Sequence, residues 1–350
     1  PATVPPWNAK ARPIFPSASH PARRPPAEPI VTTVRADNLQ LDAFADGLRR
    51  TGDARPFDFC SLSEGFLYPE RARPGVLDYF FFACAHQFGF WTLAGNRWAG
   101  PMVAPLDGRN LKGSDFLWRA CTRAWQRNPD SFVPIALDAM TDAGLNTLFQ
   151  SDADINPLPM WRDHLALTRG YARWFVARAL TPTDVLRCAQ AAPKPLAALL
   201  AALAEIPGYA EDPLQKKAML LAIVLENRPE HFLQVTDPES AVPIIDYHLQ
   251  RSALRTGLVR VENPALLAKL ESRVTVTAAE EGAVRAATYD AIQQLMARSG
   301  LSAAAVDWFF FRNRTRCPET TEPDCSACPV QAICAKATRL FQPVFRTTAY

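Results

Sequence analysis

The stretch that decides the fold is Ile206–Arg255, which reads IPGYAEDPLQKKAMLLAIVLENRPEHFLQVTDPESAVPIIDYHLQRSALR. Its opening pair, Pro207-Gly208, follows an alanine- and leucine-rich helical run at Leu196–Leu203 and precedes a second helical run at Lys216–Leu225. A glycine between two helices can adopt φ > 0 at no steric cost, so this pair predicts a tight connection. The stretch is therefore predicted to form a helix-hairpin-helix element.

One acid in the same stretch, Asp246, stands at the end of the apolar run Pro243–Ile245 and at the start of a helical run through Leu249 and Leu254. This position suits a helix N-cap, whose side chain accepts a hydrogen bond from the first helical turn. It also suits a reactive carboxylate, because acids in apolar surroundings concentrate at functional sites. Both descriptions can hold at once, and we place Asp246 first among the candidate catalytic residues.

The composition limits the class of protein. The chain has 350 residues, and its hydrophobic content of 48% is enough for one large or two modest domains. A net charge of +3 creates no global field that would attract a polyanion. No apolar run approaches the roughly 20 residues of a membrane span, and no signal-peptide core is found. We expect a cytoplasmic, monomeric protein with no membrane partner.

Three segments follow one another along the chain. Residues 1–36 are crowded with proline and predict an extended N-terminal arm. Residues 37–311 read as a succession of helices, in which Arg273–Thr277 is the only short candidate for a strand. Residues 312–350 hold a cysteine cluster and a tail. We therefore predict an all-α fold with a small C-terminal lobe.

Four cysteines in the last segment have the spacing C-x7-C-x2-C-x5-C. Four thiolates can hold a [4Fe-4S] cluster, and such sites tolerate uneven spacing because the irons face different directions. A structural zinc site of four cysteines more often shows two short C-x2–4-C pairs, whereas this segment has one. We expect a [4Fe-4S] cluster with a structural role and keep zinc as the alternative. The proposed ligands are Cys317, Cys325, Cys328 and Cys334.

The hairpin stretch resembles the helix-hairpin-helix superfamily of base-excision DNA glycosylases. The resemblance rests on Ile206–Tyr209, Lys216–Ala218 and Ile245–His248, and on the cysteine loop that follows the last apolar helix. In those enzymes the glycine-rich turn offers backbone N–H groups to a DNA phosphate. Its second glycine is Ala210 in this chain, which weakens the inference of DNA binding.

A longer part of the chain, about Phe80–Phe311, is similar to the queuosine salvage proteins. The matching segments are FGFW, KGS, LFQSD, PLPMWRDHL, IPGY, KKA, IIDYHLQRSALRTGLV, EGAVRAATYDAIQQL and VDWFFF. Members of that family are hydrolases that release the 7-deazaguanine base queuine from queuosine nucleotides. The resemblance implies a two-lobed, glycosylase-like helical fold and a hydrolase whose ligand is a modified-purine nucleotide or nucleoside.

Four positions depart from the pattern of the salvage family. Gln87 replaces an asparagine, Gln215 a tyrosine, His248 an arginine and Ala283 a glutamate. If some of these positions line the base pocket, the base differs from queuine while the chemistry stays the same.

On this resemblance Asp246 is the catalytic residue. Cleavage of an N-glycosidic bond builds positive charge on the sugar, and a carboxylate near the anomeric carbon stabilises that charge and orients or deprotonates water. Lys216 or Lys217 matches a lysine that forms a Schiff base in bifunctional DNA glycosylases, whereas the salvage enzymes have a lysine there and only hydrolyse. We expect a phosphate contact from these lysines, and the alternative is a solvated helix start.

The remaining candidates are implied to bind substrate. Asp152 matches a loop acid of the salvage family, where a carboxylate can accept the N–H groups of a guanine-like edge; the alternative is a turn cap. Phe88, Trp91 and Tyr247 can sandwich a flat base or simply belong to the core. His248 is included as a substrate contact, although a hydrogen-bonded core histidine is the commoner role.

A second function remains open on the sequence. The chain can be a [4Fe-4S] helix-hairpin-helix DNA glycosylase or DNA-binding protein of base-excision repair, with nucleic acid as its partner. The cysteine loop favours this function, whereas Ala210 and the modest net charge favour the nucleotide hydrolase. Salt-dependent affinity for duplex DNA would distinguish the two functions.

Overall fold

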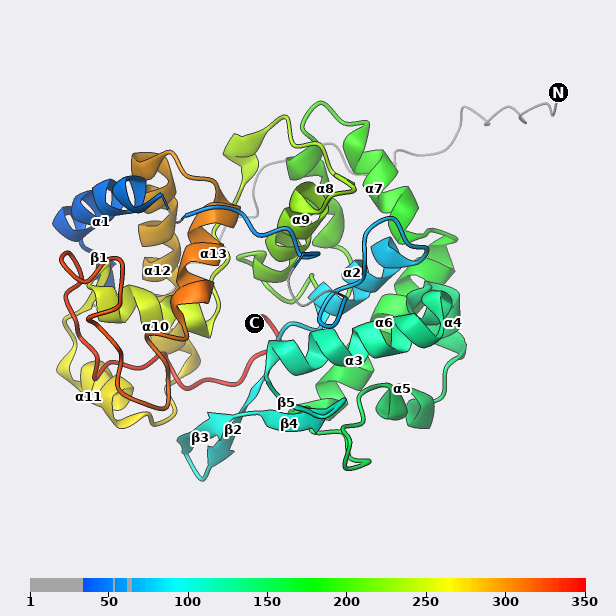
Figure 1. Ribbon diagram of the computed structural model, residues 1–350, viewed down its shortest axis with the longest axis horizontal. Coiled ribbons are helices and arrows are strands. Elements are labelled where there is room, and N and C mark those ends of the chain that lie inside the picture. The colour runs from blue at the N-terminus through cyan, green and yellow to red at the C-terminus, as the bar shows by residue number, and fades with distance from the viewer. Residues whose placement is uncertain (1–33, 53, 62–64) are drawn as a thin grey trace. The chain divides into compact units, whose positions relative to one another are not determined.

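The computed structural model describes residues 34–350, except 53 and 62–64, and this part of the chain is mostly helical (Figure 1). Its thirteen α-helices are α1 (Asn38–Thr51), α2 (Val76–Ala85), α3 (Ser114–Arg127), α4 (Pro134–Ala139), α5 (Asp142–Leu148), α6 (Trp161–Arg178), α7 (Pro182–Gln190), α8 (Pro195–Leu203), α9 (Lys216–Asn227), α10 (Tyr247–Thr256), α11 (Pro264–Ser272), α12 (Ala278–Ser299) and α13 (Ala303–Asn313). Two short 3-10 helices lie at Pro129–Phe132 and Pro238–Ser240. The predicted helical class is confirmed. Within the described residues, no helix is both long enough and apolar enough to cross a membrane.

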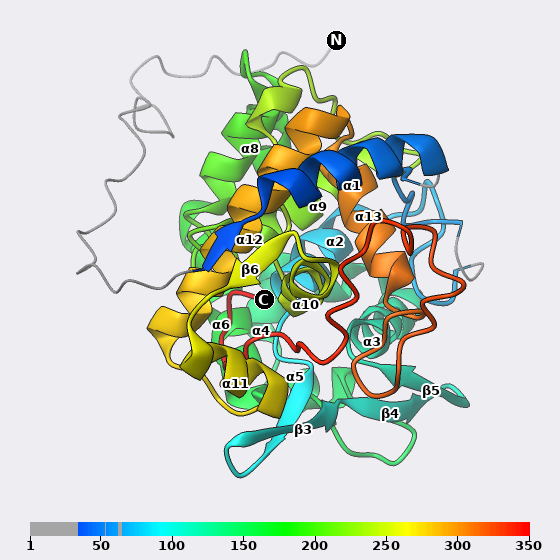
Figure 2. The ribbon, with the colours of Figure 1, turned by 90° about the vertical axis from the view of Figure 1, so that its left-hand side faces the viewer.

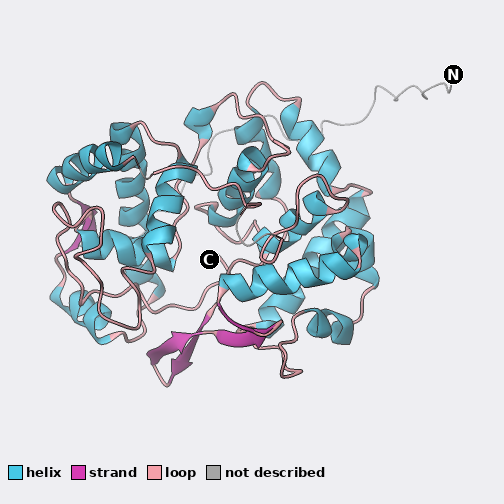
Figure 3. Ribbon diagram, in the orientation of Figure 1, coloured by secondary structure: helices cyan, strands magenta, loops and turns pink. Residues whose placement is uncertain are grey.

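Three small antiparallel sheets accompany the helices (Figure 3). Strand β2 (Trp91–Ala94) pairs with β3 (Arg97–Pro101), and β4 (Val103–Leu106) pairs with β5 (Arg109–Lys112). Strand β1 (Val34–Ala36) pairs with β6 (Val259–Val261) beside α12 (Figure 2). Residues 1–33 of the predicted arm lie outside the described residues, and the last three residues of that arm are β1.

The prediction of one strand at Arg273–Thr277 is wrong. Within this segment Val274 and Thr275 make only isolated bridges to other parts of the chain. Arg273 ends α11 with a φ of 56°, and the Thr277 side chain already caps α12 by accepting the Glu280 N–H. The segment is therefore an extended connection between two helices, too short to form a ladder.

The helices build two main hydrophobic cores. One core is formed around α2 by helices between α3 and α9, and the other is formed by α1 together with α10–α13 (Figure 1). In the second core α1 packs on α12, and α10 packs on both α12 and α13. A third, small cluster joins Trp91 and Tyr247 to the C-terminal residues Phe341–Tyr350.

Helix α2 lies at the centre of the first core because it is apolar on every face. Its residues 79–85, YFFFACA, have no exposed surface. A helix without a polar side must be covered all round, and α3, α7 and α9 supply that cover. This buried helix positions the residues that follow it, His86–Trp91.

Two histidines are buried at the end of α2. The Nδ1 atoms of His86 and His164 lie 2.9 Å apart, so one ring donates to the other, and the Thr168 hydroxyl bonds His86 Nε2 at 3.2 Å. Burial lowers the pKa of His86 well below its usual value and lowers that of His164 to about 3, with Lys217 adding to both effects. Both rings are therefore neutral in the native protein at neutral pH.

This histidine pair predicts a loss of stability in mild acid. The unfolded histidines bind protons below about pH 6.5 while the native ones do not, so the free energy of unfolding falls as the pH drops from 6.5 toward 3, by about 1.4 kcal/mol per pH unit for each ring. Urea unfolding between pH 7 and pH 4.5 measures the slope. In His164→Gln the slope should be shallower than in wild type, whereas substitution of the exposed His231 by Gln should leave it unchanged. Equal slopes in wild type and His164→Gln would refute this assignment.

Candidate active site

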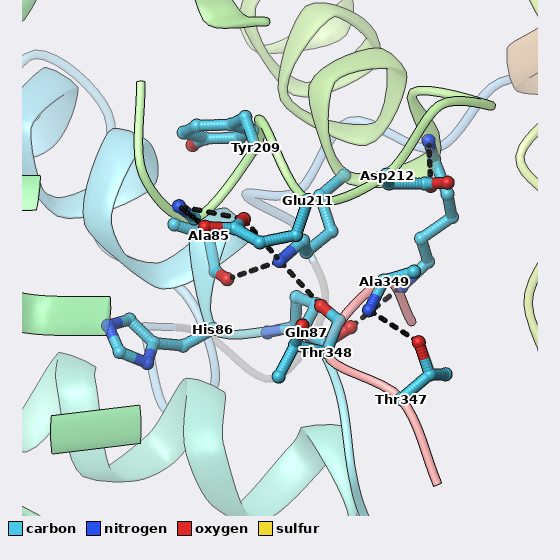
Figure 4. A network of polar contacts seen from close by, with 12 residues as sticks. Ala85, His86, Gln87, Tyr209, Glu211, Asp212, Thr347, Thr348 and Ala349 are labelled. Carbon is cyan, nitrogen blue, oxygen red and sulfur yellow. Dashed lines mark hydrogen bonds and ion pairs between the residues drawn. The ribbon is translucent and has the colours of Figure 1, made fainter. Parts of the chain in front are cut away.

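The turn between α8 and α9 depends on Gly208. Its φ of 104° confirms the predicted positive value, and an added Cβ would lie 2.8 Å from the Ala85 Cβ and 2.9 Å from Leu167 Cδ2. The Gly208 N–H donates to both carboxylate oxygens of Glu211, each at 3.0 Å (Figure 4). The backbone N–H donor of this turn is therefore already bonded to an acidic side chain of the protein.

Asp212 connects the turn to the segment that carries Asp246. Its carboxylate accepts the Lys216 N–H at 2.8 Å and two hydrogen bonds from the Arg285 guanidinium, each also at 2.8 Å. Arg285, from α12, in addition donates to the Ile245 carbonyl at 3.1 and 3.2 Å. One buried ion pair thus fixes both the start of α9 and the residue before Asp246.

The two lysines at the start of α9 have different surroundings. Lys216 lines the pocket described below, and its ammonium donates to the Gln87 carbonyl at 3.0 Å. Lys217 donates instead to the carbonyls of Ala85 at 3.2 Å and Thr348 at 2.8 Å (Figure 4). Burial lowers the pKa of both lysines, that of Lys217 to about 7. Of the pair, Lys216 is the one placed to meet a ligand, and Lys217 holds the C-terminal segment.

A pocket of roughly 630 Å³, counting its open mouth, brings several of the candidate residues together. Its charged or ionisable lining includes Lys216, Asp246, His248 and Asp307, and its aromatic walls include Tyr68, Phe90, Trp118, Tyr247, Trp308 and Phe311. Such a lining can hold a flat heterocycle between rings and present charged groups to a polar substituent.

Asp246 serves both as a helix cap and as part of this pocket. Its backbone is extended (φ −109°, ψ −176°), and its Oδ1 accepts the Leu249 N–H at 2.9 Å, as an N-cap of α10 does. The side chain is partly exposed and lines the pocket. Among the described residues no hydrogen bond to Oδ2 is found, so that oxygen is available to accept one.

Asp307 is the residue that the sequence analysis missed. It lies in α13, lines the same pocket and is partly buried. Burial and the negative charge of Asp246 together raise the pKa of Asp307 to about 7, and Lys216 opposes this shift. The available signal was a single acid in the otherwise apolar run Ala303–Phe311.

His248 lines the pocket as a neutral ring. Its Nδ1 accepts a hydrogen bond from Arg251 Nη2 at 3.0 Å, and Arg251 is in turn paired with the buried Glu319 at 3.2 Å. Burial, helped by the Arg251 charge, lowers the pKa of His248 well below its usual value. The ring can therefore exchange hydrogen bonds with a ligand without adding charge.

Three other predicted substrate residues lie outside the pocket lining. Asp152 is exposed, and its carboxylate accepts the N–H groups of Asp107 and Gly108 at 2.9 Å in the turn between β4 and β5. Phe88 is buried and stacks on His164 with ring centroids 4.0 Å apart. Trp91 is buried in the small C-terminal cluster. In this structure Asp152 therefore acts as a turn cap, and Phe88 and Trp91 are core residues.

A second pocket, of roughly 570 Å³ counting its open mouth, is lined by all four clustered cysteines together with Phe309, Phe310 and Val330. All eight cysteines of the chain are free thiols. Arg255 Nη1 donates to Cys317 Sγ at 3.3 Å, and the Lys336 N–H donates to Cys334 Sγ at 3.4 Å. Donors aimed at sulfur suit thiolate ligands of a metal group. The common pocket and these donors fit a bound cluster, although no three His, Cys, Asp or Glu side chains among the described residues form a ready site for a single metal ion.

The pocket with two carboxylates is the candidate active site. No protein-family model matches the chain, and no curated protein matches it either. The interpretation of the site therefore rests on its own residues and their geometry.

Proposed function

We propose that the protein is an N-glycoside hydrolase that releases a modified purine base of the 7-deazaguanine class from a nucleotide or nucleoside. The observation that carries the proposal is the presence of Asp246, Asp307 and Lys216 around one aromatic pocket. Such a pocket combines what this reaction needs: rings that stack on the base, and carboxylates that face a sugar on which positive charge develops. The proposal includes the helix-hairpin-helix glycosylase-like fold that the sequence resemblance implies.

The residues have distinct roles in this proposal. Aromatic walls such as Phe90 and Trp308 hold the base, and the ionised Asp246 stabilises the oxocarbenium-like sugar and accepts a proton from the attacking water. The charge of Lys216 interacts with both carboxylates, and its ammonium group can pair with an anionic substituent of the substrate. His248, held by Arg251, contributes a neutral hydrogen-bonding edge.

The turn before α9 favours a small nucleotide over duplex DNA. A helix-hairpin-helix turn binds a DNA phosphate through free backbone N–H groups, but the Gly208 N–H donates to the Glu211 carboxylate. A phosphate at this position would have to displace that carboxylate or lie against its negative charge. This local chemistry, together with a net charge of only +3, supports the nucleotide hydrolase.

We further propose that Cys317, Cys325, Cys328 and Cys334 hold a [4Fe-4S] cluster with a structural role. A bound cluster would order the loop between α13 and the C-terminal segment, which has little apolar surface of its own to bury. Arg255 ties this loop to α10, because it belongs to α10 and donates to the Cys317 sulfur and to the Pro318 carbonyl at 2.7 Å. The cysteine loop is also the observation that favours the second candidate function, a DNA glycosylase.

Protein purified without oxygen is therefore expected to contain about four irons per chain and to show a broad visible absorbance that reductant bleaches. Cys328→Ser should lose most of the iron, since it removes a ligand. Cys188→Ser, which changes a thiol outside the cysteine pocket, should retain it. Metal analysis and the visible spectrum provide the measurement. Zinc without iron in the wild-type protein would refute the cluster.

The substrate class is tested by a panel of ligands. Wild-type protein is incubated with queuosine 5′-monophosphate, with its nucleoside and with duplexes carrying damaged bases, and the free base is measured by liquid chromatography and mass spectrometry. Release from the nucleotide or nucleoside alone supports the proposal. Release from DNA alone, with a duplex affinity that falls steeply with salt, would support the glycosylase instead.

A further inference from the structure

The candidate pocket holds two carboxylates on different helices. Asp246 lies at the N-terminus of α10 and Asp307 in the second turn of α13, and Lys216 reaches the same space from the start of α9. Resting on the proposed function, we infer that Asp307 is a second catalytic residue, the general acid that protonates the departing base while Asp246 remains ionised beside the sugar. The two carboxyl groups would then have opposite protonation states when the substrate binds.

The hydrogen bonds of the two groups differ in the way this division of roles requires. Asp246 accepts the Leu249 N–H, and an ionised carboxylate oxygen can accept this bond. Within the described residues the Asp307 carboxyl has no hydrogen-bond partner, and the pocket that it lines is walled largely by aromatic side chains, Trp308 and Phe311 among them. A carboxyl group in such surroundings is favoured as the neutral acid and keeps its O–H for a ligand.

The charges that face Asp307 act in both directions. Burial and Asp246 raise the pKa of Asp307 to about 7, and Lys216 limits the rise. His248 is neutral, because burial and Arg251 lower its pKa. The pocket tyrosines Tyr68, Tyr247 and Tyr350 stay protonated, because burial raises the pKa of each. Near neutral pH Asp307 is therefore protonated in a substantial fraction of the molecules, and below pH 7 in most of them.

The chemistry of the base explains why its departure requires a proton donor. A 7-deazapurine has carbon where a purine has N7, so it has no imidazole-type nitrogen that can be protonated. As an unprotonated anion it is a poor leaving group. In the proposed step the bond from C1′ to the base nitrogen breaks, its electron pair stays with the base, and the Asp307 proton is transferred to the base. Water forms the new bond to C1′ and gives a proton to Asp246. Transfer of a proton from Asp246 to Asp307 through solvent restores the starting state, so atoms and charges balance.

The test compares pH profiles of kcat and KM for base release by wild type, Asp307→Asn and Asp307→Glu. In wild type, kcat/KM should fall as the pH rises through about 7, because the acid of the free protein loses its proton. Asp307→Asn should lower kcat by about a hundredfold or more with little change in KM, and this alkaline limb should vanish. Asp307→Glu should recover part of the rate and the limb, since it restores a proton donor.

A matched control is Asp78→Asn. Asp78, in the first turn of α2, is also partly buried and has a pKa raised by burial to about 6, but it lies outside the pocket. Its substitution should leave the pH profile unchanged. If the wild-type protein is active and Asp307→Asn keeps either the rate or the alkaline limb of the pH profile, the role of Asp307 is overturned. The proposed function would then still stand. Absence of base release by wild type from any nucleotide or nucleoside would instead overturn the proposed function, and the inference with it.

Discussion

Replacing Asp246 with asparagine is expected to lower kcat for base release by about two to three powers of ten or more. A fixed charge facing the developing positive charge of the sugar contributes about 3 kcal/mol or more to transition-state stabilisation, and asparagine has no such charge. KM should change little, because the base and any phosphate are held by other residues. Steady-state kinetics at neutral pH measures both quantities.

The fold should tolerate this substitution. Asparagine can accept the Leu249 N–H as aspartate does, so the melting temperature should stay within a few degrees of wild type. The matched control is Asp37→Asn, because Asp37 caps α1 by accepting the Gln40 N–H three residues on and lies outside the pocket. Equal activity of Asp246→Asn and wild type would show that Asp246 is only a cap.

Replacing Arg285 with methionine is expected to reduce the free energy of unfolding by about 3–5 kcal/mol. The change leaves the Asp212 carboxylate buried without its cation and removes both donors from the Ile245 carbonyl. Because Ile245 precedes Asp246, base release should fall as well. Urea denaturation gives the free energy, and an unchanged m-value would show that the unfolded state is not responsible.

Two further variants show whether the loss comes from the unpaired charge. Adding Asp212→Asn to Arg285→Met should restore part of the stability, because the uncompensated charge is removed. Arg35→Met breaks an exposed pair with Glu262 and should cost less than about 1 kcal/mol. A loss below about 1 kcal/mol for Arg285→Met would contradict the central position given to this ion pair.

The sequence predicted the helical class because its local signals agree with one another. The turn at Gly208 has the positive φ expected of it, and Thr181 and Asp184 form a capping box at the start of α7. Asp246 was identified because an acid between an apolar run and a helix suits both an N-cap and a reactive carboxylate. These features depend on neighbours within a few residues, which is the range over which sequence patterns carry physical information.

The short strands were missed although one of them had a local signal. Asp107-Gly108 stands between β4 and β5, and a two-residue Asp-Gly loop is a strong indication of a hairpin. Both residues have positive φ, at 49° and 73°. The strand Trp91–Ala94 offers no such signal, since four apolar or small residues fit a strand or the end of a buried run equally well.

The composition of the pocket could be predicted only in part, because it depends on packing between distant segments. Asp246 and Asp307 are far apart in sequence, and no periodicity relates them. Lys216 and Lys217 are adjacent, but successive side chains of a helix point about 100° apart, so only Lys216 lines the pocket. Phe88 and Phe90 are both aromatic and buried, and which of them meets the pocket depends on the turn at Gly89, whose φ is 75°.

The central claim is that this pocket hydrolyses an N-glycosidic bond with a carboxylate and water. The most direct measurement follows free base and free reducing sugar together, from one nucleotide incubated with excess wild-type protein in the presence and absence of borohydride. Without borohydride the account predicts equal amounts of both products. With borohydride, which also reduces the free sugar, it predicts no protein–sugar adduct, because Lys216 binds and does not react. A sugar trapped on Lys216, or base released without free sugar, would contradict it.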